Sequence, residues 1–289
     1  MGILSVIKLA LIGLAALFVL IILLIAISDI SFNKRVEKEM NILKDEIPGT
    51  QGQTFTYDDI EGLPEPVQRY FKYSIKEGQA YIQFARLEHT GSFRMDVGRD
   101  WYPVEGKECF TADVPAFIWY GKVKMNPLVW VKARDKYHNG TGNMLIKLQS
   151  TIKIADEQGR ELSQSDLVRW LGEAPFFPTA LLPGKDLRWE EIDSDSARVI
   201  VEDHGLHVSG VFYFNEKGQI TRFLTHDRFR TVDYRQVNDP FNGYYRDYQE
   251  YNGFMIPTEI EAVWDLDEGN FSYAKFKVED IQYEFYDER

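Results

Sequence analysis

The hydrophobic residues of this chain follow two different patterns. The first is a continuous apolar run from Leu9 to Ile27, which contains no charged side chain. About 20 such residues cross the hydrocarbon core of a bilayer as a helix. The run therefore predicts an N-terminal transmembrane helix. From Ala80 onward apolar and polar residues alternate instead, which is typical of antiparallel strands that bury one face.

The alternation recurs along most of the remaining chain, and turn residues separate its segments. It is clearest in the segments 117–125, 144–154, 208–214 and 256–266. Asn252-Gly253 is the strongest hairpin turn, and the phase slips near Arg86 and Glu279-Asp280 predict bulges. We count about eleven strands. Long, bulged strands favour a mainly β fold with one large curved antiparallel sheet or half-open barrel.

Two helices are predicted beside this sheet. The first lies near residues 64–75, where an apolar stripe follows Leu63-Pro64. The second lies near residues 163–172, where Ser163 is a candidate cap and Gly172 a stop signal. The segment Ser163–Gly184 continues past that helix with aromatic residues and prolines. We expect it to form a lid or plug over the sheet, with Arg169 and Glu173 as a surface or lid-hinge ion pair.

This organisation predicts a transmembrane anchor at 1–30, a polar tether at 31–60 and a single β domain at 61–289. The part of the tether near Asn33–Lys44 is compatible with a continued helix. Ala26-Ile27-Ser28 weakly resembles a cleavage site, but the apolar run is longer than the core of a typical signal peptide, so we favour an uncleaved anchor. The basic residues after the run would place the β domain in the cytoplasm. Because N-terminal signal-like segments usually direct export, we instead expect a single-pass membrane protein with an extracytoplasmic β domain.

Charge and cysteine content exclude several functions. The 289 residues carry a net charge of −12, which argues against general nucleic-acid binding. Cys109 is the only cysteine, so the chain has no internal disulfide and no cysteine-based zinc site.

His204 and His207 are three residues apart, which on a strand points them to opposite faces. His226 lacks the sequence context of a nucleophilic triad. We therefore predict no metal, no cofactor and no catalytic residue.

The aromatic residues are the strongest candidates for binding. They either fill a closed core or line an apolar cavity for a lipid or similar ligand. The cavity candidates are Phe110, Phe117, Trp119, Trp130, Trp170, Phe176, Phe177 and Leu181. Arg228, Arg230 and Arg235 form a basic cluster near Tyr234. This cluster either meets an anionic head group or is a solvated edge balanced by neighbouring aspartates.

Four segments carry a resemblance to a known family: LPEPVQRY (63–70), FTADVPAFIW (110–119), RWLGEAPFFPTALLP (169–183) and LRWE (187–190). They resemble an uncharacterised bacterial family classed as a domain of unknown function, over about Leu63 to Phe285. The resemblance implies a membrane-anchored protein whose fold is similar to that of the periplasmic lipoprotein carriers. That fold is an unclosed antiparallel barrel of about eleven strands with helices across its mouth. The resemblance supplies no catalytic residues.

These observations favour a membrane-tethered, non-enzymatic domain that binds a lipid or other hydrophobic ligand in a curved-sheet cavity. The alternative is a structural or protein-interaction module of the cell envelope. An envelope hydrolase using His204 or His226 is the least favoured interpretation.

Overall fold

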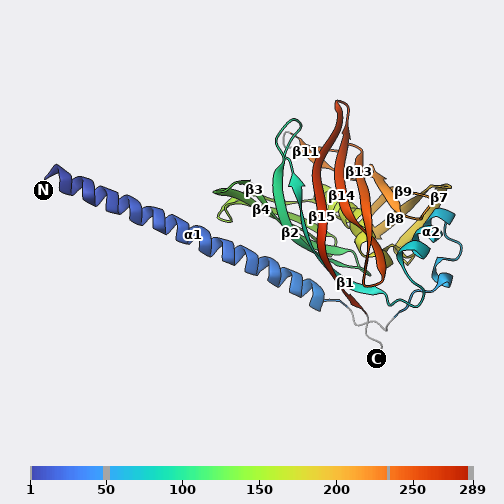
Figure 1. The fold of residues 1–289 in the computed structure, drawn as a ribbon. Coiled ribbons are helices and arrows are strands. Elements are labelled where there is room, and N and C mark those ends of the chain that lie inside the picture. Colours follow the sequence, from blue (N-terminus) through green and yellow to red (C-terminus); the bar gives the residue numbers. More distant parts are fainter. Residues whose placement is uncertain (1, 48–52, 233–234, 286–289) are drawn as a thin grey trace.

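The computed structural model describes residues 2–47, 53–232 and 235–285, which form one long helix and a curved β domain (Figure 1). The helical elements are α1 Ile3–Asp45, η1 Tyr57–Ile60, α2 Glu65–Ser74, α3 Arg160–Glu173, η2 Ala174–Phe176 and η3 Pro178–Leu181. The strands are β1 Ile82–Phe93, β2 Tyr102–Thr111, β3 Ala116–Asn126, β4 Val129–His138, β5 Thr141–Leu148, β6 Ile152–Gln158, β7 Leu187–Asp193, β8 Ser196–Asp203, β9 Leu206–Phe214, β10 Ile220–Thr225, β11 Arg230–Val232, β12 Arg235–Val237, β13 Phe241–Tyr251, β14 Phe254–Leu266 and β15 Gly269–Phe285.

Thirteen strands form one antiparallel sheet in the order β6-β5-β4-β3-β2-β1-β15-β14-β13-β10-β9-β8-β7, and β11 and β12 pair separately. The edge strands β6 and β7 do not pair with each other, so the sheet stays open, and the predicted fold class is confirmed. The main sheet has more strands than the expected eleven. The edge strand β7 buries only its first residue, so the alternation that reveals a strand is weakest there.

Two local predictions about the strands are confirmed. The register between β1 and β15 shifts where Glu88 pairs with Asp280 and His89 with Val278, which leaves a bulge at Glu279. Asn252 and Gly253 form the tight turn between β13 and β14, both with positive φ (50° and 90°). An Asn-Gly pair adopts this conformation with little strain.

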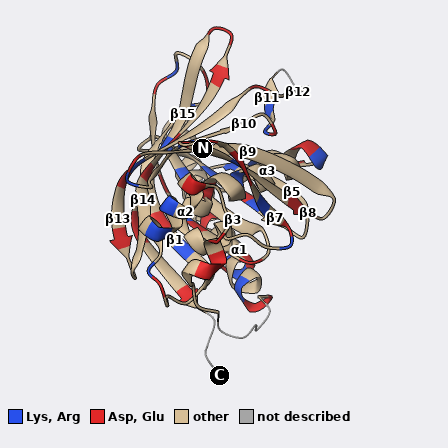
Figure 2. Ribbon diagram, turned by 90° about the vertical axis from the view of Figure 1, so that its right-hand side faces the viewer, with Lys and Arg blue, Asp and Glu red and all other residues tan. Residues whose placement is uncertain are grey.

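The segment α3–η2–η3 lies inside the curve of the sheet and connects its two edges. Figure 2 shows the sheet curving around α2 and α3, and α3 contacts β4 and β5 on one side and β9 on the other. The predicted helix start was wrong by one turn: α3 begins at Arg160, after Gly159 with φ 147°. Ser163 does not cap the helix, because its hydroxyl donates to the carbonyl of Gly159 and accepts from the amide of Gly142. The other predicted helix is present as α2.

Helix α1 runs without interruption through the predicted boundary between anchor and tether. The most apolar stretch of its N-terminal half is not buried against any described part of the β domain (Figure 1). Its second half buries Phe32, Val36, Met40 and Leu43 against the outer face of the sheet. The expected helical continuation near 33–44 is therefore confirmed, while Pro48, Gly49 and Gly52 of the predicted tether lie outside the described residues.

Because α1 covers part of the outer face, strands β2 to β5 bury residues of both faces along part of their length. The expectation of a single buried face is wrong for this part of the sheet. Lys132 and Arg134 occupy polar positions of β4, yet their side chains are only 2% exposed. Lys132 Nζ pairs with Asp29 at 2.6 Å, and Arg134 Nε pairs with Glu39 at 3.2 Å. Buried charges need such partners, so these pairs fix α1 on the sheet.

Candidate functional site

A cavity of about 440 Å³ lies on the concave side of the sheet, above one face of α3. Ligand pockets in proteins typically measure about 300–1,000 Å³. Most of its wall is apolar and comes from residues on strands β1 to β6, on β10 and on β13 to β15. They include Phe93, Val123, Val131, Met144, Ile260 and Phe276. The inside of the half-barrel is thus divided: one end is packed with side chains around α3, η2 and η3, and the other end is hollow.

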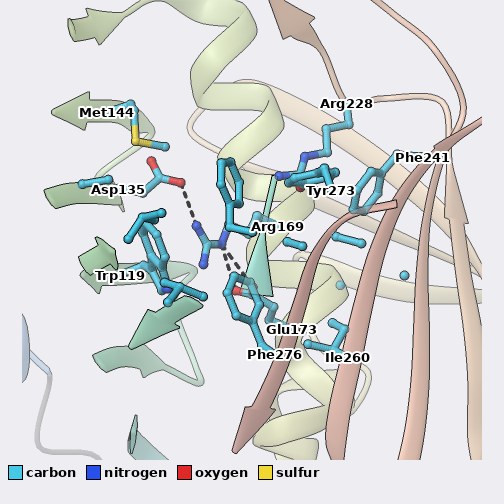
Figure 3. A pocket seen from close by; sticks show the side chains of 18 of the residues that line it. Trp119, Asp135, Met144, Arg169, Glu173, Arg228, Phe241, Ile260, Tyr273 and Phe276 are labelled. Atoms are coloured by element: carbon cyan, nitrogen blue, oxygen red, sulfur yellow. Dashed lines mark hydrogen bonds and ion pairs between the residues drawn. The ribbon is translucent and has the colours of Figure 1, made fainter. Parts of the chain in front are cut away.

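The floor of the cavity is built around Arg169 of α3 (Figure 3). Its guanidinium donates to Glu108 of β2 at 2.9 Å, to Asp135 of β4 at 2.9 Å and to Glu173 at 3.1 Å. The guanidinium carbon also lies 5.0 Å from the ring centroid of Phe117 and 5.1 Å from that of Trp119. These hydrogen bonds use a donor on each of the three guanidinium nitrogens of Arg169. Its charge is therefore neutralised within the protein.

The carboxyl groups around Arg169 outnumber it. Burial raises the pKa of Glu108 and that of Asp166 well above their usual range, although Arg169 acts in the opposite direction. Burial also raises the pKa of Asp135. Oδ1 of Asp135 and Oδ2 of Asp166 are buried without a hydrogen-bond partner in the described structure. Asp135, which lines the cavity, therefore has one buried carboxyl oxygen that no group of the described structure satisfies.

Trp119 is held in the cavity wall by His89. The indole Nε1 donates to Nε2 of His89 at 2.8 Å, so the imidazole is neutral with its proton on Nδ1. Burial, and then the charge of Arg169, lowers the pKa of His89 to about 3. Gly106 and Gly121 make room for the two rings, because a Cβ at either position would overlap them. The pair is a fixed wall, and His89 stays uncharged across the physiological pH range.

Arg228 is the second cation of the cavity. No direct ion pair or hydrogen bond of its guanidinium is seen in the described part of the chain, although its charge lowers the pKa of Asp135 and that of Asp166 against the effect of burial. The guanidinium carbon stacks over Phe241 at 4.1 Å and lies 5.7 Å from the ring of Trp264. Figure 3 shows Arg228 beside Phe241 and Tyr273. Arg230, by contrast, pairs with Asp239 and does not line the cavity. Arg235 lies on the exposed β12, and Asp233 and Tyr234 are outside the described residues.

The predicted site residues occupy three different places. Trp119, Arg169 and Glu173 line the cavity. The Arg169–Glu173 pair is present, but it is buried rather than at the surface, with side chains 9% and 11% exposed. Trp130 is half-buried beside Lys122 and Ser150, and it does not line the cavity. The remaining candidates belong to the packed core: Phe110, Phe117, Trp170, Phe176, Phe177 and Leu181.

Sequence reasoning missed the strand residues that complete the floor, chiefly Asp135 and Glu108. A single acidic residue within an alternating strand gives no signal of its own. The histidines singled out earlier lie elsewhere. His204 and His207 are exposed and each pairs with an adjacent carboxylate, Asp203 and Glu202. Within the described ranges, no three metal-binding side chains are placed to hold an ion.

Fold and site together define the class of protein: an open antiparallel half-barrel with an internal apolar cavity, joined to an N-terminal helix that is long and apolar enough to cross a membrane. The chain belongs to the family of unknown function DUF6544, whose profile matches residues 53–276. The family membership expected from the motifs is thereby confirmed. No curated protein sequence matches the chain.

Among solved structures the chain is similar to a LolA-superfamily protein from Nitrosomonas europaea, with 10% identity and a TM-score of 0.41 over 75% of this chain and 91% of that one. It is also similar to a putative outer membrane lipoprotein-sorting protein domain from Vibrio parahaemolyticus, with 8% identity and a TM-score of 0.37 over 78% and 91% of the two chains. A DUF1329 protein from Desulfovibrio piger gives 10% identity and a TM-score of 0.40 over 70% and 86%. Lipoprotein-carrier-like proteins are thus among its neighbours, as the resemblance implied. At these scores nothing about ligand or mechanism follows.

Proposed function

We propose that the chain is a membrane-anchored binding protein whose cavity holds the hydrocarbon chain of an anionic amphiphile such as a fatty acid. The observation that carries the proposal is the combination of an apolar cavity of about 440 Å³ with one cation, Arg228, that makes no direct ion pair with a carboxylate of the described residues and acts on Asp135 and Asp166 only through its charge. Burial of hydrocarbon contributes roughly 0.8 kcal/mol per methylene. Eight buried methylenes therefore supply about 6 kcal/mol before the cost of association.

The two cations of the cavity have different roles in this proposal. Arg169 already holds three carboxylates, so an anionic head group at Arg169 would meet their charge. Arg228 stacks on aromatic rings that leave the edge of its guanidinium available. A carboxylate or phosphate ester placed there forms charge-assisted hydrogen bonds. The head group is therefore assigned to Arg228 and the hydrocarbon to the wall formed by residues such as Val123, Val131 and Ile260.

Photo-cross-linking with a diazirine-bearing fatty acid tests this assignment on the full-length protein in detergent micelles. We expect saturable labelling of peptides that line the cavity, and competition by the unmodified fatty acid. Arg228→Met should weaken the apparent affinity roughly 10- to 100-fold, because a hydrogen bond to a charged group contributes about 1.5–3 kcal/mol. Arg230→Met is the matched control and should bind as the wild type does.

Two results would contradict the proposal. One is labelling that does not saturate or that falls on the outer face of the sheet. The other is an Arg228→Met variant that binds as tightly as Arg230→Met. Native mass spectrometry of protein extracted from its host membrane gives an independent check, since a bound amphiphile appears as a discrete mass increment.

We also propose that α1 is retained as an anchor and that the β domain faces the extracytoplasmic side. An N-terminal apolar segment that leads the chain favours export, and α1 continues without a break into the part packed on the sheet. A C-terminal alkaline phosphatase fusion should be active in the bacterial host. An inactive fusion together with a fluorescent green fluorescent protein fusion would place the domain in the cytoplasm.

A further inference from the structure

One end of the sheet, formed by the β1–β2 and β3–β4 hairpins and strand β6, carries most of the exposed apolar side chains of the β domain. Eight large apolar residues outside α1 are exposed in the described structure, and five of them lie at this end. Met95 and Val97 are in the β1–β2 hairpin, Leu128 is at the tip of the β3–β4 hairpin, and Ile152 and Ile154 are on the edge strand β6. Leu128 is 77% exposed. We call these five residues the rim.

The rim lies at the end of the β domain that faces the apolar part of α1. Asp29 and Glu39 of α1 and the C-cap residue Glu46 contact in turn Lys132, Arg134 and His138 of β4. The helix therefore runs in the same direction as β4. Lys132 is level with the first charged residue after the apolar run, and Leu128 is four residues further toward the strand's start. At about 3.3 Å per residue the hairpin tip extends roughly 13 Å past that level. Figure 1 shows the β3–β4 hairpin reaching out on the side of the apolar half of α1.

Two tryptophans with basic neighbours flank the rim. Trp101 follows the β1–β2 hairpin and lies beneath the guanidinium of Arg94, at 4.7 Å from its ring centroid. Trp130 follows the β3–β4 hairpin and lies beneath the ammonium of Lys122, at 5.3 Å. Tryptophan is enriched where a protein crosses the interface between water and lipid, because its ring is apolar and its N–H is polar. The combination of apolar tips, tryptophans and cations matches a bilayer surface.

The cavity opens at the same rim. Met95 and Ile154 line the cavity and are also 54% and 57% exposed. Deeper in the cavity lie Trp119, Asp135 and Arg169, at the level of α3. We propose that the rim docks on the bilayer in which α1 is inserted, so that the cavity mouth faces lipid and the amphiphile enters from the membrane without passing through water. The route of entry rests on the proposed function, whereas the docking of the rim does not.

Lipid-phase quenching tests the docking on the full-length protein in vesicles of phosphatidylethanolamine and phosphatidylglycerol. A polarity-sensitive fluorophore is attached to Leu128→Cys, and separately to Val114→Cys as the matched control. Val114 is an exposed residue of the β2–β3 turn at the opposite end of the sheet. We expect brominated phospholipids to quench the probe at position 128 at least threefold more than the probe at position 114. Equal quenching at the two positions would overturn the docking.

A second measurement tests the entry route with the rim variant Val97→Asp/Leu128→Asp. The diazirine fatty acid is supplied either within the same vesicles or added to protein in detergent. We expect labelling from the vesicles to fall at least fivefold in the rim variant, with labelling in detergent unchanged. Val114→Asp should label as the wild type does in both settings.

The outcomes separate the two proposals. Unchanged labelling of the rim variant from vesicles overturns entry through the rim. Loss of labelling in both settings overturns it too, because the variant has then damaged the site itself. A wild-type protein that takes up no fatty acid in either setting removes the proposed function, and the quenching result still decides the docking.

Discussion

The buried cluster around Arg169 gives a sharp test of the structure through the variant Arg169→Met. Methionine keeps the length and apolar character of the side chain but removes the guanidinium. The side chains of Glu108 and Asp135 are each 4% exposed, and that of Glu173 is 11% exposed. These carboxyls would be left without their cation in a buried site. Removing one partner of a buried ion pair typically costs about 3–5 kcal/mol.

The pH dependence of that cost follows from the pKa shifts. Burial raises the pKa of Glu108, Asp135 and Asp166 in the folded protein, so the folded state binds more protons than the unfolded state. Their contribution is most favourable at low pH and is lost as pH rises above the unfolded pKa of about 4. Arg169 lowers all three pKa values. Removal of Arg169 raises these three pKa values further. For each additional proton that the folded state retains, the free energy of unfolding falls by about a further 1.4 kcal/mol per pH unit as the pH rises.

We therefore expect Arg169→Met to lower the free energy of unfolding by about 3–5 kcal/mol at pH 7.5 and by less at pH 5, because the raised pKa values of Glu108, Asp135 and Asp166 let the folded state bind protons as the pH falls. Denaturant unfolding of the full-length protein in detergent micelles, followed by tryptophan fluorescence, measures this difference. Adding Glu108→Gln, Asp135→Asn and Glu173→Gln to Arg169→Met should recover most of the loss.

Arg230→Met is the control for the loss of a cation, because the Arg230–Asp239 pair is 28% and 25% exposed and should contribute about 0–1 kcal/mol. A deficit of the same size at pH 5 and pH 7.5 would refute the reasoning. Failure of the neutralised quadruple variant to recover stability would do so as well.

Three further predictions follow from the packing. Gly91→Ala should destabilise the protein by about 1–3 kcal/mol in the same unfolding assay, because its Cβ would collide with the carbonyl of Lys275. Gly184→Ala, which has open space around it, should be neutral or slightly stabilising. Burial raises the pKa of the Cys109 thiol, so maleimide should label Cys109 only after the protein unfolds. Mass spectrometry measures this labelling, and rapid labelling of the native protein would contradict the burial of Cys109. Ala262→Trp should fill the cavity and abolish cross-linking to the fatty acid, with the free energy of unfolding within about 1.5 kcal/mol of the wild type. Retained cross-linking would place the ligand elsewhere.

Local patterns of the sequence predicted much of the scaffold. The apolar run Leu9–Ile27 predicts a helix because no other backbone structure satisfies its own hydrogen bonds in lipid, and α1 contains it. Alternation with period two predicts strands, and Asn252-Gly253 marks a hairpin that the structure contains. The i,i+4 spacing of Arg169 and Glu173 predicts their pairing, since residues four apart share one face of a helix. Each of these predictions depends only on residues close together in the chain.

Only the tertiary structure decided which aromatic residues meet the cavity. Phe117 and Trp119 share one face of β3, yet Phe117 is in the core and Trp119 lines the hollow end. The difference comes from the position of α3, which fills one part of the curved sheet and leaves the other open. Period-two alternation tells which face a residue occupies, but it does not tell how far along the strand the plug reaches.

The floor of the site is likewise a product of tertiary structure. Glu108, Asp135 and Arg169 are far apart in sequence and meet because β2, β4 and α3 converge inside the curve. The packing of α1 on the outer face also turned the polar positions Lys132 and Arg134 into buried ion pairs. Sequence patterns therefore determined the elements and their amphipathic faces. The burial of each charge depended on which distant element covered it, because the free energy of a charge in a protein depends on its surroundings rather than on its neighbours in the chain.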